Sequence, residues 1–334
     1  MKVCIYFEGI ENIAKSGIGR AFKHQIKICV DQEIEYTTDY KDSYDILHIN
    51  TIFLKSSEAI KYARKQGAKV IYYAHTTKED FQNSFTLSNV IAPGLKTWLM
   101  YLYSKADLIL TPTKYSKSLL IEYGIKKPII SLSNGIDIER FKPSVVKENK
   151  FRNYFKVKDD EKIIISVGLW FERKGILDFI ELAKQLSEYR FIWFGYTPKA
   201  SIPAKISQAI ENKPANCLFP GYISGDIIEG AYSNASAFVF MSYEETEGIV
   251  VLEALASKQN VLVRDIPVYG DWLKNGYNVL KATTIKDFKK QLNYFIENPQ
   301  NEIRENGYEI AKTRDIKVIG RQLKEIYVNV LKNM

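Results

Sequence analysis

The chain has 334 residues, of which 46% are hydrophobic and 26% are charged. This is the composition of a globular protein with room for two domains, and no run approaches the roughly 18 apolar residues of a membrane-spanning helix. Its three cysteines (Cys4, Cys29 and Cys217) are too far apart to predict a disulfide framework or a metal site, which favours a reducing cytoplasm.

The net charge of +8 is compatible with a nucleic acid, an anionic membrane or a phosphorylated ligand as partner. The nucleic acid is disfavoured, because no arginine-rich or aromatic-interleaved stripe is present.

In the first half, apolar β-prone runs alternate with helical stretches. Strands are expected at residues 2–7, 45–50, 70–77, 107–112 and 128–132, and the first of these is no secretion signal. A glycine turn, Ser16-Gly-Ile-Gly-Arg20, follows the first strand and precedes a helix. It would let the backbone approach a phosphate, although an ordinary strand–helix turn explains it equally well.

The histidines differ in position. His75 stands at the carboxyl end of its strand, the edge where open α/β sheets bind ligands. His48 is expected to be structural and His24 to lie at the surface.

Residues 98–103 form an apolar stretch with lysines at its flanks, Lys96 and Lys105. A helix that is apolar on every side is either core or in contact with a membrane, and both interpretations stay open. The candidate membrane or acceptor residues are Lys61, Arg64, Lys65, Trp98, Leu99, Tyr101 and Leu102.

A polar stretch at residues 141–158 is expected to link two domains, because the strand–helix alternation restarts after it. Further strands are expected at 162–168, 191–194, 217–219, 237–241 and 260–263, and an apolar stripe marks a last helix at 316–330. The predicted fold is α/β, with two doubly wound Rossmann-like domains at 1–143 and 144–312 facing a cleft. Residues 313–334 are expected to pack back toward the first domain.

The most informative stretch runs from Ala237 to Ala256 and predicts a strand, an acidic loop and a helix. The first turn of such a helix, near Gly248, suits a phosphate, while Glu245 and Glu253 could accept hydrogen bonds from sugar hydroxyls. A solvated acidic loop is the alternative, and a solvated basic turn is likewise the alternative for the loop at Arg173 and Lys174.

Taken together, these motifs resemble the GT-B glycosyltransferases of family 4, over nearly the whole chain. The marks are the Ser16–Arg20 turn, His75, Ser133-Asn-Gly-Ile-Asp137, Val167-Gly168 with Arg173-Lys174-Gly175, and the Glu-x7-Glu pair Glu245/Glu253. In many relatives an arginine follows the Val-Gly motif, where this chain has Leu169, so Arg173 would have to supply that charge.

The resemblance implies a GT-B fold and a role for each matched residue. Arg173 and Lys174 would hold the donor diphosphate, Gly17 would approach it, Glu253 would bind the ribose, Glu245 would hold the donor sugar and His75 would line the reaction centre. The catalytic residues implied are Glu245, His75, Arg173 and Lys174; the nucleotide-sugar site comprises Gly17, Gly168, Arg173, Lys174, Thr246, Glu247, Gly248, Ile249 and Glu253. No Asp-x-Asp is present, so no metal and no cofactor is expected.

Within the family, the chain is most similar to the bacterial diacylglycerol glycolipid synthases, through Gly168-Leu-Trp-Phe-Glu-Arg-Lys-Gly175, Asp178-Phe-Ile-Glu, Phe191-Ile-Trp-Phe-Gly195 and residues 85–98. This implies a retaining hexosyltransferase that moves glucose or galactose from a UDP-sugar to a glycolipid such as monoglucosyl-diacylglycerol. It would be cytoplasmic, on the anionic inner face of the cell membrane. The alternatives are a family-4 transferase for capsule or surface glycans, with a soluble or polyprenol-linked acceptor, and a non-catalytic GT-B partner subunit.

Overall fold

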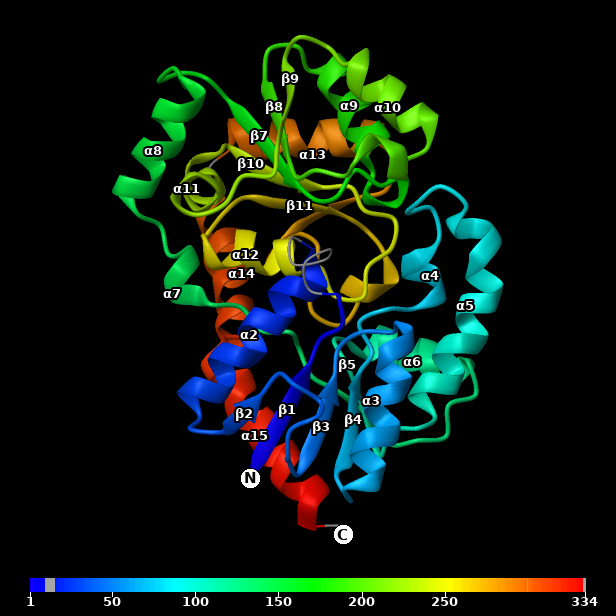
Figure 1. The fold of residues 1–334 in the computed structure, drawn as a ribbon. Helices are drawn as coiled ribbons and strands as arrows, with labels where there is room; N and C mark the ends of the chain where they lie inside the picture. Colours follow the sequence, from blue (N-terminus) through cyan, green and yellow to red (C-terminus); the bar gives the residue numbers. More distant parts are fainter. Residues whose placement is uncertain (10–15, 299, 333–334) are drawn as a thin grey trace. The chain divides into compact units, whose positions relative to one another are not determined.

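The computed structural model describes residues 1–9, 16–298 and 300–332 (Figure 1). They fall into two compact units. Unit 1 comprises Met1–Phe81, Asn89–Gly135 and Arg314–Met334, whereas unit 2 comprises Gln82–Ser88 and Ile136–Thr313.

Unit 1 is built on a parallel sheet of six strands in the order β2-β1-β3-β4-β5-β6. β1, β3, β4 and β5 are almost entirely buried, because a parallel sheet is covered on both faces. The strands are β1 (Lys2–Tyr6), β2 (Glu35–Thr37), β3 (Ile46–Ile49), β4 (Lys69–Tyr73), β5 (Leu108–Thr111) and β6 (Ile129–Ser131).

Helices cover both faces of this sheet. One core contains buried residues of the sheet with those of α3 (Leu54–Lys65), α5 (Ser88–Tyr103) and α6 (Lys114–Glu122). The other joins the sheet to α2 (Gly17–Asp31) and the C-terminal helix α15 (Ile316–Lys332). α15 runs close to α2, since a Cβ added at Gly320 would lie 3.2 Å from Ile28 Cγ2. The short helix α4 (Lys78–Phe81) completes the unit.

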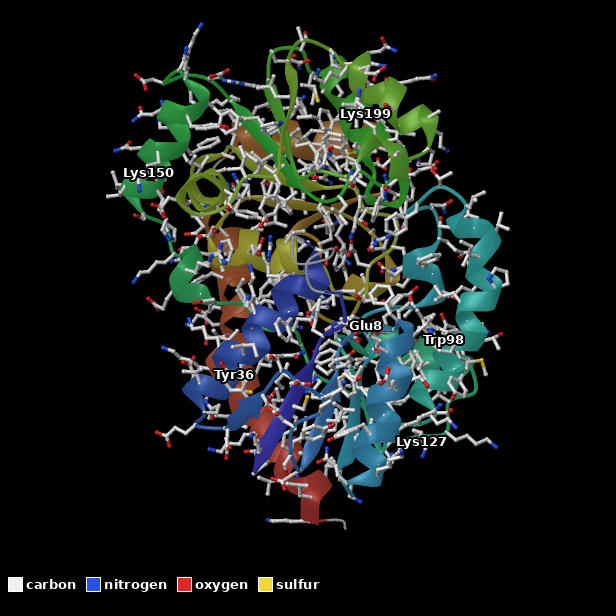
Figure 2. The ribbon with its side chains drawn as sticks, viewed as in Figure 1. Glu8, Tyr36, Trp98, Lys127, Lys150 and Lys199 are labelled. Carbon is white, nitrogen blue, oxygen red and sulfur yellow. The ribbon has the colours of Figure 1, made fainter. Side chains whose placement is uncertain are left out.

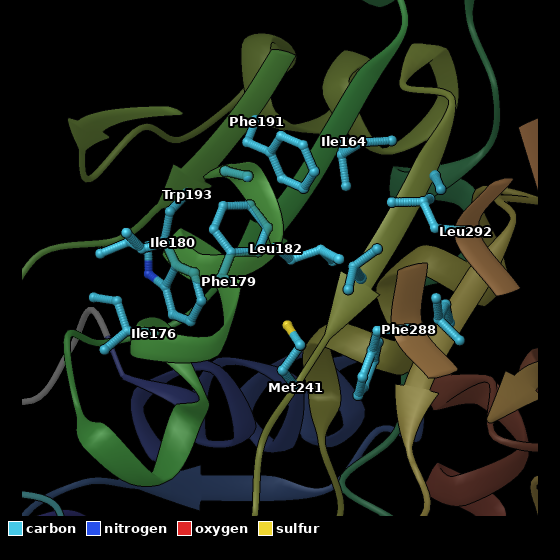
Figure 3. Close-up of a cluster of buried hydrophobic side chains, with 14 of the residues drawn as sticks. Ile164, Ile176, Phe179, Ile180, Leu182, Phe191, Trp193, Met241, Phe288 and Leu292 are labelled. Atoms are coloured by element: carbon cyan, nitrogen blue, oxygen red, sulfur yellow. The ribbon is translucent and has the colours of Figure 1, made fainter. Parts of the chain in front are cut away.

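Unit 2 repeats the plan with a second parallel sheet, in the order β12-β11-β10-β7-β8-β9. The strands are β7 (Ile163–Val167), β8 (Arg190–Phe194), β9 (Cys217–Gly221), β10 (Ala237–Phe240), β11 (Val261–Arg264) and β12 (Leu280–Ala282). One face carries an aromatic core in which Phe179 meets Phe191 and Trp193 edge to face, with Phe288 and Leu292 in the same cluster (Figure 3).

Helices surround this second sheet as well. The aromatic core takes residues from α9 (Ile176–Gln185), α10 (Ala204–Glu211) and α13 (Ile285–Glu297). The remaining α-helices are α7 (Ile138–Phe141), α8 (Val145–Phe155), α11 (Asp226–Asn234), α12 (Ile249–Ala256) and α14 (Asn301–Thr313), and 3₁₀ turns occur at η1 (Glu172–Lys174), η2 (Lys199–Ser201) and η3 (Pro267–Tyr269).

The predicted fold class is confirmed, since the described residues form two doubly wound parallel α/β sheets. The predicted linker at 141–158 is wrong, because α8 occupies most of it and packs on α11 within unit 2. The prediction failed because most residues of this segment are polar. α8 buries only Phe151 and Phe155, so its sequence has the composition of a solvated linker. Among the described residues, no helix combines the length and the apolar character needed to cross a bilayer.

The close approach of α8 to α11 depends on Gly230, where an added Cβ would lie 2.0 Å from the carbonyl oxygen of Lys147. We expect Gly230→Ala to force the two helices apart and lower the free energy of unfolding by about 1–3 kcal/mol, as overpacking does. Urea unfolding followed by circular dichroism measures this. Gly94→Ala is the matched control, because α5 is open at that position; equal stability of both variants would contradict the prediction.

Candidate functional site

The likeliest place for a ligand in a doubly wound sheet is where the strand order reverses. In unit 2 this point lies between β7 and β10, which are neighbours in the sheet although two strands, β8 and β9, come between them in the chain. The loops that follow these two strands are residues 168–175 and 242–248. They carry most of the residues predicted for the nucleotide-sugar site.

Two cations and one carboxylate meet between these loops. Lys174 Nζ donates a short hydrogen bond to Glu245 Oε1, and a guanidinium nitrogen of Arg173 lies 3.9 Å from the same oxygen. All three side chains are largely buried, with exposed side-chain fractions of 14%, 8% and 10% for Lys174, Glu245 and Arg173. Charges with so little water around them are costly unless paired, so this ion group is a strong candidate for binding a charged ligand.

Glycines allow the loops to approach this closely. Gly175 has a φ of +77°, and a Cβ there would lie 2.2 Å from the carbonyl oxygen of Met241, at the end of β10. Gly195, with a φ of +129°, similarly lets the loop after β8 reach the carbonyl oxygen of Gly168. A side chain at Gly175 would separate the basic loop from the start of the acidic one, and a side chain at Gly195 would separate the loop after β8 from the loop after β7.

Arg173 is held by hydrogen bonds to the short segment Gln82–Ser88, which connects α4 to α5. Its Nε donates to Ser84 Oγ at 2.7 Å, and its backbone N–H donates to the carbonyl of Asn83 at 3.1 Å. Phe85 packs edge to face on Phe171, with ring centroids 4.6 Å apart. The segment Gln82–Ser88 therefore belongs to unit 2 and fixes the basic loop.

The acidic loop leads into α12 through Gly248, which has a φ of +90° and no side-chain cap. The predicted residues Thr246 and Glu247 precede it, and Ile249 begins the helix. Glu253 is buried inside α12, and its carboxylate accepts a hydrogen bond from Tyr232 OH at 2.7 Å. The acidic loop and α12 thus form one continuous segment, which carries Glu245 of the ion group and, in the helix, Glu253.

A second layer holds the acidic loop from behind. Arg264 donates to the carbonyl of Met241 at 2.9 Å and, through a short bond, to Asp178. Its guanidinium carbon lies 3.8 Å from the ring centroid of Tyr243, whose hydroxyl donates to Asp178 at 2.6 Å. The backbone N–H of Tyr243 in turn donates to the carbonyl of Arg173 at 2.7 Å, which ties the two loops together.

In unit 1, two predicted site residues follow strands of the sheet. His75 lies just beyond β4 and is 5% exposed, and its Nε2 is 2.9 Å from Asn50 Oδ1. Burial lowers the pKa of His75 to about 3, so the imidazole is neutral at physiological pH. Gly17 begins α2, capped by Ser16, and nothing lies within 4 Å of a Cβ added there.

Two predictions about histidines meet different outcomes. His48 is buried, as expected of a structural residue, and its Nδ1 is 2.6 Å from Tyr327 OH of α15. The prediction that His24 lies at the surface is wrong: it is 5% exposed, with its Nδ1 3.3 Å from the carbonyl of Asn134. His24 lies on the buried side of α2, together with Ala21, Gln25 and Ile28.

The candidate membrane residues on α5 differ in how far they are buried. Leu99 and Leu102 are completely buried in unit 1, so the prediction of membrane contact is wrong for both; they face the sheet, and core packing explains their apolar character. Trp98 (Figure 2) is partly buried and its indole N–H donates to the carbonyl of Ile52 at 2.6 Å. Tyr101 is 42% exposed.

The basic candidates are on the surface. Lys61 and Lys65 are exposed on α3, whereas the exposed Arg64 is engaged by Asp107 through two hydrogen bonds of 2.7 and 3.0 Å.

Sequence reasoning assigned no role to the side chains that position the others. They are Gln25, Asn50, Ser84, Asp178, Tyr232, Tyr243 and Arg264. Asn50 carried a signal as a polar residue at the carboxyl end of a strand, and Asp178 carried one as part of the quoted motif Asp178-Phe-Ile-Glu; the rest become neighbours of the site only through the fold.

Two protein-family models match the chain. Glycosyltransferase Family 4 covers residues 30–140, and Glycosyl transferases group 1 covers residues 147–314. A processive diacylglycerol alpha-glucosyltransferase of Acholeplasma laidlawii is 46% identical over 333 residues, which cover 99% of each of the two chains. An alpha-galactosylglucosyldiacylglycerol synthase of Streptococcus pneumoniae is 22% identical, over 90% of this chain and 83% of its own.

Solved structures share the fold. Anabaena Alr3699/HepE, in a crystal structure with UDP-glucose, matches 98% of this chain and 100% of its own with a TM-score of 0.76 and 19% identity. Sucrose-phosphate synthase from Thermosynechococcus elongatus matches 87% of this chain and 75% of its own, also with a TM-score of 0.76, at 17% identity.

The contact between Ser84 and Arg173 can be tested through stability. We expect Ser84→Ala to lower the free energy of unfolding by about 1–3 kcal/mol, because it removes a hydrogen bond to a largely buried charged group. Urea unfolding followed by circular dichroism measures the change. Thr86→Ala is the control, since that side chain is exposed in the same segment; unchanged stability in Ser84→Ala would remove this role of the segment.

Proposed function

Because the chain belongs to the family-4 glycosyltransferases of GT-B fold, we propose that it transfers glucose from UDP-glucose to a diacylglycerol glycolipid, with retention of the anomeric configuration. The relative from Acholeplasma laidlawii supports glucose as the sugar and diacylglycerol as the lipid class, since 46% identity extends over the whole chain. Hexosyl transfer is the activity of the family, and the donor is proposed from the neighbour bound to UDP-glucose.

The proposed donor site is supported mainly by one observation, the ion group formed by Arg173, Lys174 and Glu245. Two cations on a loop at the sheet's switch point, facing a helix that begins at Gly248 without a side-chain cap, suit a diphosphate. In the structure, Glu245 lies beside both cations. We propose that the diphosphate takes over Lys174 and Arg173, which frees the Glu245 carboxylate to accept hydrogen bonds from the hexose.

The remaining residues of the site take related roles in this proposal. Gly168 leaves room for the diphosphate beside the basic loop, and residues 246–249 offer backbone N–H groups. Glu253 binds the ribose, for which its carboxylate would share or exchange its bond with Tyr232 OH. In unit 1, Gly17 offers backbone N–H groups to the donor and His75 contacts the reacting sugars.

Transfer separates charge, since the anomeric carbon becomes positive while the leaving phosphate becomes more negative. Groups fixed in advance stabilise such charge at little reorganisation cost, which is the main expected source of rate enhancement. Lys174 and Arg173 would stabilise departing UDP. Retention follows if the acceptor hydroxyl attacks on the face that UDP leaves and passes its proton to the leaving phosphate oxygen, so that no covalent enzyme intermediate is formed.

The activity test uses purified protein, UDP-glucose and monoglucosyl-diacylglycerol in mixed micelles, with the product identified by mass and by the anomeric coupling in NMR. We expect an α-linked diglucosyl lipid. Lys174→Ala should lower kcat about 100- to 1,000-fold, as loss of a transition-state donor does. Lys199→Ala, which removes an exposed lysine paired with Glu211, is the control. Near-normal turnover in Lys174→Ala would refute the assignment.

One observation favours a second candidate acceptor. The burial of Leu99 and Leu102 is what a transferase using a soluble or polyprenol-linked acceptor would show. The same assay, run in parallel with a polyprenol-linked sugar as acceptor, distinguishes the two candidates. An enzyme of the second kind would leave the diacylglycerol glycolipid unmodified. It would still hydrolyse UDP-glucose or transfer glucose from it to the polyprenol-linked sugar.

A lipid acceptor requires the protein to work at a bilayer surface, and we propose peripheral binding to the anionic inner face of the cell membrane. Lys61 and Lys65 provide exposed positive charge on α3. In the first turn of α5, Val90 and Ile91 are 76% and 53% exposed, so we propose the start of that helix, in place of residues 98–102, as the apolar contact.

Vesicle flotation tests this surface. We expect Lys61→Ala combined with Lys65→Ala to weaken binding to phosphatidylglycerol-containing vesicles about 30-fold, because each basic residue contributes about 1 kcal/mol near an anionic leaflet. Lys150→Ala with Lys199→Ala is the matched control: both are exposed in unit 2 and the net charge changes equally (Figure 2). Equal losses in the two double variants, or no preference for anionic vesicles, would contradict the proposal.

A further inference from the structure

A pair of buried side-chain amides stands behind His75 in unit 1. Gln25 lies in α2, Asn50 directly follows β3 and His75 is the second residue after β4, so three elements meet at this point. Gln25 and Asn50 are only 3% and 2% exposed. Two primary amides without water are costly unless each satisfies the other, so their arrangement is narrowly determined.

The two amides form a reciprocal pair. Gln25 Nε2 donates to Asn50 Oδ1 at 2.8 Å, and Asn50 Nδ2 donates to Gln25 Oε1, also at 2.8 Å. Asn50 Oδ1 lies 2.9 Å from His75 Nε2 as well. An amide oxygen has no proton to give, so the proton of this last hydrogen bond belongs to the imidazole.

This arrangement selects one of the two neutral forms of His75. Its proton is on Nε2, and Nδ1 keeps the lone pair. The imidazole stays neutral because burial holds its pKa near 3, so Nδ1 can accept a hydrogen bond throughout the physiological range. Turning over both amides together would preserve their pairing, yet it would place an NH₂ group against Nε2 and move the proton to Nδ1.

The ring plane is fixed too. Tyr73 stacks on His75 with centroids 4.2 Å apart and an interplanar angle of 4°. The phenol of Tyr73 is itself anchored, by a short hydrogen bond to the carbonyl of Leu132. With one face against Tyr73 and one edge against Asn50, the imidazole has little freedom to rotate.

We propose that Gln25 and Asn50 are positioning residues for His75, which hold its proton on Nε2 and so present the Nδ1 lone pair to a hydroxyl group of a bound sugar substrate. This inference rests on the proposed function only for the identity of that substrate. The Nδ1 lone pair can accept a hydrogen bond from the hydroxyl group and so orient it. In the opposite tautomer, Nδ1 would carry a proton and could no longer accept that hydrogen bond.

The tautomer can be measured directly. The chain has three histidines, so long-range ¹H–¹⁵N correlation spectra of ¹⁵N-histidine-labelled protein resolve each ring, with His75→Gln identifying the signals of His75. We expect the Nε2–H form in the unmodified protein. A proton on Nδ1 would overturn the proposal, and this measurement needs no variant of the amide pair.

Variants then test the cause. Asn50→Leu removes the oxygen and should give a mixture of tautomers, whereas Asn50→Asp keeps an acceptor there and should retain the proton on Nε2. The signals of His24 and His48 are followed in the same spectra for comparison. Gln25→Leu leaves Asn50 free to turn and should give an intermediate result, and it serves where Asn50→Leu folds poorly. Unchanged Nε2–H in both leucine variants would overturn the proposal.

Kinetics separate positioning from a purely structural role. Misplacing a reacting group by about 1 Å can cost about 100-fold in rate, so we expect Asn50→Leu to lower kcat about 10- to 100-fold while the KM for UDP-glucose changes less than about 3-fold. Equal loss in both parameters would indicate general damage and count against positioning. If His75→Gln retained full turnover, the proposed role of His75 would fail, while the tautomer result would stand by itself.

Discussion

The contact on which unit 2 depends is the one between Lys174 and Glu245, with Arg173 beside them. Buried ions are tolerated only with a partner, and here the Glu245 carboxylate lies within 3.9 Å of both cations, near the point where β7 and β10 adjoin. In the proposed function, the diphosphate of the donor would take over Arg173 and Lys174 from this carboxylate.

Much of the surrounding structure serves to keep those loops in contact. Gly175 allows the basic loop to reach the end of β10, the segment Gln82–Ser88 seats Arg173, and Arg264 holds Tyr243 with Asp178 behind the acidic loop. Each of these contacts is short and largely buried. Under the proposed function, such support would preorganise the site, so that its charges need not be rearranged as the transition state forms.

In unit 1, the candidate site residue His75 is oriented by neutral groups rather than by charges. His75 is kept uncharged by burial and oriented by Asn50, Gln25 and Tyr73, so hydrogen-bond direction rather than charge defines what it offers. The apolar helix α5 shows how the same composition can serve two purposes: Leu99 and Leu102 pack inside the unit, while Val90 and Ile91 at its start remain exposed.

The sequence by itself determined the alternation of buried strands and helices, and hence the α/β class, because hydrophobic period and glycine turns are local properties. Together with the family resemblance, it also singled out Arg173, Lys174, Glu245, Glu253 and His75 as candidate site residues, of which the structure brings Arg173, Lys174 and Glu245 together. Only the tertiary structure decided which side of α5 is core, that residues 145–155 are a packed helix, and that Ser84, Arg264 and Gln25 support distant site residues. Those contacts join positions far apart in the chain, and long-range pairing leaves no periodic trace in a single sequence.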